Sequence, residues 1–172
     1  ALKKAGDAII TAYVELFRGT PMLVQALLFY YGFLSKLEMP LLSAIIIISI
    51  NTGAYMAEIV RGGIISVDKG QFEGAHAIGM THGQTMLNVV LPQAIRTMIP
   101  SIINQFIITL KDTSILSVIG FPELVNTAKN VVANTMSAFQ VWTIVAVMYL
   151  VVITLLSRLA KKVERRLNRG RQ

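Results

Sequence analysis

Three polar residues that could do chemistry lie on one predicted helical face in the first long apolar run of the sequence. Asn51, Tyr55 and Glu58 are spaced by four and three residues, which places them together on a helix. A polar group without a partner is costly in hydrocarbon, so such residues either join helices or line the path of a polar solute. Both interpretations stay open for Asn51. For Glu58 the sequence favours an ion pair with Arg61.

A second polar set follows Pro100. Asn104 and Gln105 are adjacent, and Gln105 and Asp112 are seven residues apart, so a helix would place these last two on one face. The run ends in Lys111-Asp112-Thr113-Ser114. A helix that breaks there, inside a bundle, would expose backbone groups as well as side chains, and solute sites in transporters use such breaks.

Metal and hydrolytic chemistry receive little support from the sequence. His76 and His82 are six residues apart, a spacing that does not stack them on one helical face, and no His-Glu-x-x-His arrangement occurs. The sequence has no Cys, which excludes thiolate metal sites and disulfides. No phosphate-binding G-x-x-x-x-G-K-[ST] loop occurs either. We therefore predict that the chain is not an enzyme and carries no cofactor.

Composition indicates which elements position these residues. The chain has 172 residues, 54% of them hydrophobic, and residues 39–57 and 130–157 contain no charge. Each of these runs is long enough for the roughly 20 residues that cross a bilayer core. The sequence predicts one all-α integral membrane domain over 1–172, a polytopic helical bundle, in preference to the buried helices of a soluble protein. The predicted spans are 20–35, 39–60, 93–110 and 138–157.

The basic residues predict the orientation of these spans. Thirteen of the 16 Lys and Arg residues fall on one side, and only Lys36, Lys111 and Lys129 fall on the other. Positive residues accumulate in short cytoplasmic loops, so both termini and segment 66–92 are predicted to be cytoplasmic. Topology then accounts for the net charge of +7, and no nucleic-acid partner is needed.

Segment 73–92, EGAHAIGMTHGQTMLNVVLP, is polar and contains three glycines, and it lies between long apolar runs. Asp68 precedes Gln71 by three residues, and Thr81 precedes Gln84 by three, the spacing of the capping box. We therefore predict two short helices that meet at Gly79. The small residues of this segment would let another protein approach the backbone closely. These are Gly74, Ala75 and Gly79.

At this point the sequence resembles the permease subunits of ATP-binding-cassette (ABC) importers. Their cytoplasmic loop carries a Glu-Ala-Ala motif, a Gly four residues later, and an aliphatic residue before Leu-Pro. The matching residues here are Glu73, Gly74 in place of the first Ala, Ala75, Gly79, Val89, Leu91 and Pro92. Two further stretches, 13–25 and 111–114, are similar to the polar amino acid branch of that family.

The resemblance implies a type I importer (MetI-like) fold in the bacterial cytoplasmic membrane, with one N-terminal span missing from this chain. It also implies several partners. A second permease subunit, identical or similar, would complete the path, and two ABC ATPase subunits would bind ATP and Mg and dock on the hairpin at 66–92. An extracytoplasmic binding protein would deliver a polar amino acid, and lipid would surround the spans.

For such a solute, the charges of the second polar set suggest roles. Asp112 would accept from the α-ammonium group, Thr113 and Ser114 would donate to the carboxylate, and Gln105 would face the side chain. A neutral Gln105 favours an uncharged or amide solute. The alternative is that Lys111 and Asp112 pair at the membrane edge and that Thr113 caps the next helix. An ion-coupled secondary transporter or channel is the alternative function, ahead of a membrane-embedded enzyme.

Overall fold

The computed structural model describes residues 2–34, 36 and 39–168, and within them it contains helices and no strand. The chain begins with α1 (Leu2–Gly19), α2 (Met22–Phe29) and a π-helical turn, η1 (Tyr30–Leu34). The long helix α3 (Pro40–Ile65) follows, with a proline in its first turn, where no N–H donor is needed. The remaining elements are α4 (Lys69–Ala77), α5 (His82–Thr85), the π-helical η3 (Met86–Val90), α6 (Leu91–Asp112), the 3-10 helix η4 (Thr113–Ile119), α7 (Leu124–Thr135) and α8 (Ala138–Asn168).

Within the described residues, three helical segments are long and apolar enough to cross a membrane: Pro40–Ile65, His82–Ile119 and Ala138–Arg165. They correspond to the predicted spans 39–60, 93–110 and 138–157, and each extends beyond the predicted C-terminal bound. The span predicted at 20–35 is instead a helical segment of 13 residues, Met22–Leu34, about 20 Å long. It is short because Pro21 has an extended backbone that separates it from α1.

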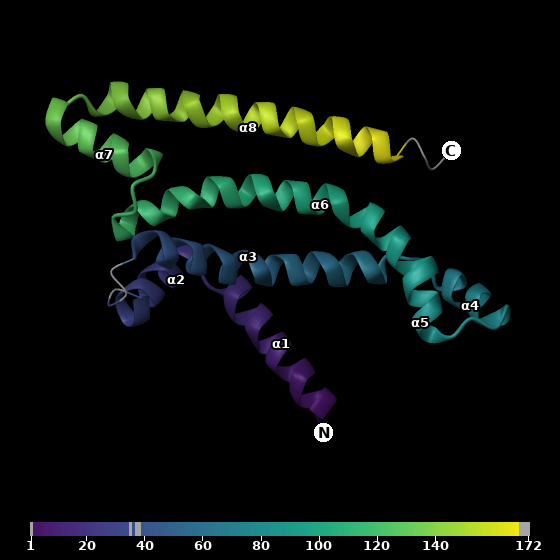
Figure 1. Ribbon diagram of the computed structural model, residues 1–172. Coiled ribbons are helices and arrows are strands. Elements are labelled where there is room, and N and C mark those ends of the chain that lie inside the picture. The colour runs from purple at the N-terminus through teal and green to yellow at the C-terminus, as the bar shows by residue number, and fades with distance from the viewer. Residues whose placement is uncertain (1, 35, 37–38, 169–172) are drawn as a thin grey trace.

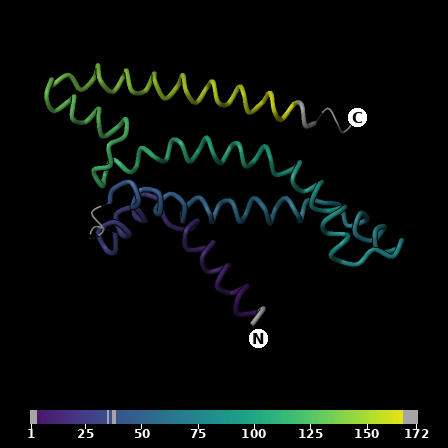
Figure 2. Tube along the Cα trace, viewed as in Figure 1, coloured from purple at the N-terminus to yellow at the C-terminus, as the bar shows by residue number. Residues whose placement is uncertain are grey.

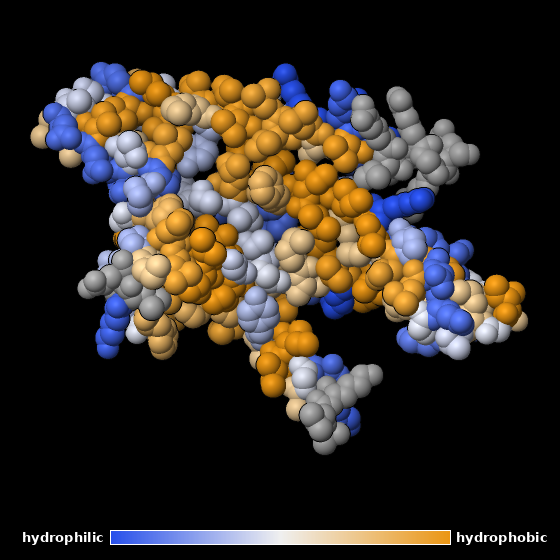
Figure 3. Space-filling view, in the orientation of Figure 1, coloured by the Kyte–Doolittle hydropathy of each residue, from blue (hydrophilic) through white to orange (hydrophobic). Residues whose placement is uncertain are grey.

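The long helices lie side by side in a row (Figures 1 and 2). Helix α6 packs between α3 and α8, and α1 crosses α3 on the side away from α6. The short helices α4 and α5 occupy one end of the row, and α7 lies at the other end, where it packs on α8. Most of the apolar side chains on α8 are exposed, and Figure 3 shows this apolar surface continuing over the row. An exposed apolar surface of this size fits a bilayer.

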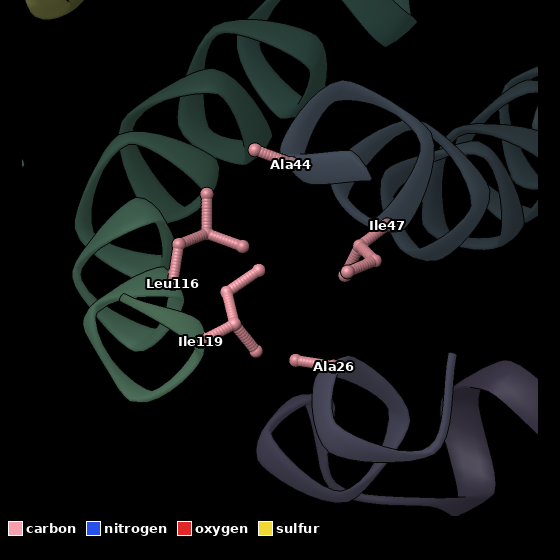
Figure 4. Close-up of a cluster of buried hydrophobic side chains, with 5 residues drawn as sticks. All are labelled: Ala26, Ala44, Ile47, Leu116 and Ile119. Carbon is pink, nitrogen blue, oxygen red and sulfur yellow. The ribbon is translucent and has the colours of Figure 1, made fainter. Parts of the chain in front are cut away.

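Two clusters of buried side chains hold the row together. The first joins α2, α3 and η4 through Ala26, Ala44, Ile47, Leu116 and Ile119, which point toward one another in Figure 4. This packing shelters the short segment Met22–Leu34 against its neighbours. The second cluster lies at the α4 end and consists of Val67, Val90, Ala94 and Met98.

Helix α7 was not expected from the sequence. The 3-10 helix before it ends at Gly120, whose φ of 76° is in the left-handed region that glycine adopts without strain. Glu123 then caps α7, because its carboxylate accepts from the N–H groups of Val125 and Asn126 at 2.9 and 2.6 Å.

Candidate functional site

The hairpin between α3 and α6 has the two predicted short helices. The Asp68 carboxylate accepts from the Gly70 N–H at 2.7 Å and starts α4. At α5 the capping box is complete: the Gln84 side chain accepts from the Thr81 N–H at 2.9 Å, and the Thr81 hydroxyl accepts from the Gln84 N–H. The Gln71 side chain does not close a box with Asp68 but accepts from Gln93 at 3.2 Å, tying α4 to α6.

The small residues of the hairpin have different environments. Gly79 forms the turn with a φ of 87°, a conformation that residues with a side chain rarely adopt. Gly74 is exposed, with no atom near the place where a side chain would begin. Ala75, predicted to be part of the same open side, is only 6% exposed. It lines a groove of about 240 Å³ whose other walls are Gly70, Gln71, Gly74, Ile78, Met80 and Val89.

The structure brings the two histidines together, which their spacing did not predict. The rings of His76 on α4 and His82 on α5 are stacked with centroids 6.4 Å apart, and Phe72 stacks on His82. His76 Nδ1 also lies 3.0 Å from the Met80 carbonyl oxygen. Two imidazoles make an incomplete ligand set, and the described residues contain no group of three potential metal ligands.

The motif residues that follow connect the hairpin to the long helix α6. Leu91 and Pro92 begin α6 directly after the π-helical turn η3, and Pro92 needs no N–H partner there. Glu73 is exposed on α4. The hairpin is therefore a separately capped unit whose exit continues without a loop into a predicted span.

Asn51 lies in a buried hydrogen-bonded network that the sequence did not reveal. Its side-chain amide donates to Gln25 Oε1 at 2.8 Å, and both residues are only 5% exposed. Gln25 Nε2 donates in turn to the carbonyl oxygens of Phe17 and Thr20 at 2.8 and 2.9 Å. The network holds α1, α2 and α3 together where Pro21 interrupts the chain. The partner of Asn51 is 26 residues away, so helical periodicity gives no signal of it.

The charged residues near the end of α3 form a second group. The predicted pair is present, since the Arg61 guanidinium donates to the Glu58 carboxylate. Arg18 of α1 joins this pair, which helical spacing does not predict: it lies 3.5 Å from Glu58, and its guanidinium lies 5.7 Å from the centre of the Tyr55 ring. Arg18, Glu58 and Arg61 border a cavity of about 650 Å³ between α1 and α3, which Glu15 also lines.

The polar residues of α6 divide between two sides of the helix. Gln105 is 6% exposed and its amide lies 3.4 Å from the Thr109 hydroxyl, which is itself 3.2 Å from the Thr52 hydroxyl of α3. Asn104, next to Gln105 in sequence, is exposed. It lies on the same helical face as Thr97, Ser101 and Lys111, which are exposed too and which sequence reasoning did not select.

Segment 111–114 marks the change from α6 to η4. Asp112 is half-buried, and the described ion pairs do not join it to Lys111, as the alternative interpretation required. The Thr113 hydroxyl donates to the Leu110 carbonyl oxygen at 2.7 Å, so it closes α6 and does not cap a later helix. Ser114 lines a cavity of about 390 Å³ with Lys111 and with residues of α7 and α8.

Comparison with known proteins decides the family. Residues 1–169 match the model of the binding-protein-dependent transport system inner membrane component. The chain belongs to this family. The predicted assignment, a permease of the polar amino acid branch of ABC importers, is confirmed by this match and by the relatives described next.

Two of these relatives are bacterial permeases. The permease is 38% identical over 163 residues to the glutamine transport system permease protein GlnP of Escherichia coli K12, covering 92% of this chain and 74% of that protein. It is 42% identical over 165 residues to the L-cystine transport system permease protein TcyB of Bacillus subtilis 168, covering 94% of this chain and 70% of the relative.

Two solved structures share the fold. An amino acid ABC transporter crystallised with histidines superimposes with a TM-score of 0.85 at 42% identity, covering 91% of the permease and 74% of that chain. The MetNI methionine ABC transporter superimposes with a TM-score of 0.78, covering 96% of the permease and 76% of that chain. At 17% identity the second likeness shows the fold alone, and it confirms the predicted MetI-like arrangement.

Proposed function

We propose that the permease imports a polar amino acid across the bacterial cytoplasmic membrane as part of an ATP-driven importer. Relatives that cover most of the chain are named for the transport of glutamine and cystine, which supports a polar amino acid as the solute. The chain has no phosphate-binding loop, so ATP and Mg belong to separate ATPase subunits. A second permease subunit and an extracytoplasmic binding protein complete the assembly, and both termini of this segment face the cytoplasm.

The observation that carries this proposal is the hairpin at 66–92. It is capped at both of its short helices, displays Glu73 and Gly74 on its surface, and continues through η3 into α6. A unit fixed in this way can pass a movement of a docked ATPase to a spanning helix as a rigid-body shift. We infer that Glu73, Gly74, Ala75, Gly79, Leu91 and Pro92 couple ATP hydrolysis to transport.

Two glycines of the hairpin provide a matched test of docking. A Cβ atom added at Gly74 or at Gly83 meets no atom of a more distant residue within 4 Å, so we expect Gly74→Leu and Gly83→Leu to keep the hairpin folded. Only Gly74 belongs to the small-residue motif. We expect Gly74→Leu to abolish solute-stimulated ATP hydrolysis in liposomes and Gly83→Leu to retain most of it. Equal stimulation in both variants would exclude the Gly74 surface as the docking site.

Co-purification separates this function from an ion-coupled secondary transporter or channel, which needs no ATPase. A tagged full-length permease, co-expressed with the ATPase encoded beside it and extracted in mild detergent, should retain that subunit. Gly74→Leu should weaken the retention and Gly83→Leu should not. If neither the wild type nor the variants retain an ATPase, the importer proposal is wrong.

The solute contacts belong to the same proposal. We propose that Asp112 accepts from the α-ammonium group and that Thr113 and Ser114 bind the carboxylate, where α6 gives way to η4. Asn104 would line the approach from the exposed side of α6. Asn51, Tyr55 and Gln105 stay as predicted contacts, although the side chains of Asn51, Gln105 and Thr113 already have hydrogen-bond partners within the chain.

A further inference from the structure

Helix α8 is longer than a bilayer core requires. It runs for 31 residues, about 46 Å, whereas the hydrocarbon core is about 30 Å thick. Its uncharged part, from Ala138 to Ser157, is 20 residues long and alone accounts for about 30 Å. The helix then continues without a break into a strongly basic segment. The start of that segment therefore lies at the depth of the lipid headgroups.

Four basic side chains form one face of this continuation, which we call the basic face: Arg158, Lys161, Lys162 and Arg165. Their spacing of three, one and three residues places them together on a helix. Among the described side chains, these four line a depression of about 450 Å³, large enough for a phospholipid headgroup. Glu164 lies between them in sequence but on another side of the helix, and the ion pairs of the described residues involve Glu58 alone among carboxylates.

An apolar stripe runs beside the basic face. Leu155, Leu159 and Val163 are spaced by four residues and are 55%, 60% and 42% exposed. Leu155 belongs to the part of α8 that crosses the hydrocarbon core, whereas Leu159 and Val163 lie on the same turns as the basic side chains, at headgroup depth. Because both stripes lie on the same turns, the ligand has to combine hydrocarbon with negative charge.

We propose that the basic face binds anionic phospholipid, with the lipid phosphodiester among the four cations, its glycerol region beside Leu159 and Val163, and its acyl chains running past Leu155 into the core. Clusters of four or more Lys and Arg residues directly after a span attract anionic lipid. Each basic side chain adds to this attraction if it lies within about one Debye length of the membrane surface. A soluble phosphate compound would meet the same charges but would leave the apolar stripe uncovered. The proposal does not depend on the solute or on the ATPase.

The single tryptophan of the permease makes a direct test possible. Trp142 lies at the opposite end of α8 from the basic face, and it can be removed by Trp142→Phe. In that background, Leu159→Trp places the only indole beside the basic face. The full chain is reconstituted in phosphatidylcholine vesicles that contain brominated phosphatidylglycerol or brominated phosphatidylcholine. Bromine quenches the indole on contact, so the two titrations give the relative association constant at each end of α8.

We expect phosphatidylglycerol to be preferred about threefold or more at position 159 and equally with phosphatidylcholine at Trp142. Replacing all four basic residues by Gln should reduce the preference at position 159 to about one, whereas Arg158→Lys with Arg165→Lys should keep it. Salt of about 1 M, where the Debye length is about 3 Å, should weaken it. Quenching by brominated phosphatidylcholine checks that every variant is inserted.

Three results would overturn the proposal. The first is equal association of phosphatidylglycerol and phosphatidylcholine at position 159 in the Trp142→Phe, Leu159→Trp chain that keeps all four basic residues. The second is a preference that survives the fourfold Gln replacement. The third is loss of the preference when glycerol 3-phosphate is added at millimolar concentration, which would identify a site for free phosphate in place of a lipid site.

Discussion

The hydrogen bond between Asn51 and Gln25 makes the most specific prediction about stability. Asn51→Ala removes a buried donor and leaves Gln25 Oε1 without a partner, at a cost of about 1–3 kcal/mol. Gln25→Ala also removes the bonds to the Phe17 and Thr20 carbonyl oxygens, so it should cost more, about 2–4 kcal/mol. In the double variant the shared bond is lost only once. The coupling energy should therefore be about 0.6 kcal/mol, the average for interhelical hydrogen bonds in membrane proteins, and at most about 1.7 kcal/mol.

The assay is reversible unfolding in mixed micelles for the wild type, both single variants and the double variant. Solute uptake at matched expression is measured in parallel, because a contact with solute would raise the KM of Asn51→Ala without requiring coupling to Gln25. A coupling energy below about 0.3 kcal/mol would refute the argument that this bond joins α2 to α3. A raised KM together with strong coupling would show that Asn51 serves both roles.

The other predictions concern packing, solute recognition and the hairpin turn. A side chain at Gly63 would meet Met98, which is 5% exposed, so Gly63→Ala should lower the free energy of unfolding by about 1–3 kcal/mol. Adding Met98→Ala to the Gly63→Ala variant should restore part of this loss. Asp112→Asn keeps the size of the side chain but removes its charge. Uptake should therefore fall by one to two orders of magnitude, as the loss of a charge-assisted hydrogen bond of roughly 1.5–3 kcal/mol implies. Normal uptake, with basal ATP hydrolysis retained, would show that Asp112 does not contact the solute. Gln105→Glu should shift selectivity toward cationic amino acids, and unchanged selectivity would assign Gln105 to helix packing. Gly79→Ala forces a side chain into a left-handed turn, so amide hydrogen exchange over 69–85 should be faster than in the wild type, while exchange of α3 stays unchanged. Exchange over 69–85 at the wild-type rate would contradict the argument that this turn is strained by a side chain.

The local features of the hairpin were predictable because they depend on neighbouring residues. A cap is made by a side chain two or three positions from the N–H that it accepts, so Asp68 and Thr81 could be identified from spacing alone. The same holds for the pair of Glu58 and Arg61, one helical turn apart. The long apolar runs were identified for a related reason, since bilayer thickness sets a minimum length that is visible in the sequence.

Features that depend on contacts between distant residues were not predictable in the same way. Helical spacing placed Asn51 on a face but gave no indication that Gln25 would meet it there, nor that Arg18 would reach Glu58. The segment at 20–35 is somewhat shorter than predicted because Pro21 breaks the helix before it, and hydropathy alone does not register that break. Sheltered by the cluster around Ile47, the shorter helix is stable without the length of a full span.

The two sides of α6 suggest which of its polar residues can serve the solute. On the side toward α3, Gln105 and Thr109 already share their hydrogen-bonding groups with each other and with Thr52. On the opposite side of α6, which we call the outer side, Asn104 is exposed on a helix that is long and apolar enough to cross a membrane. An exposed amide there would face lipid at a cost, unless a second subunit or an aqueous path covers it. A solute needs donors and acceptors that are not already satisfied, so the outer side of α6, together with Asp112 at its end, is the stronger candidate for the translocation path.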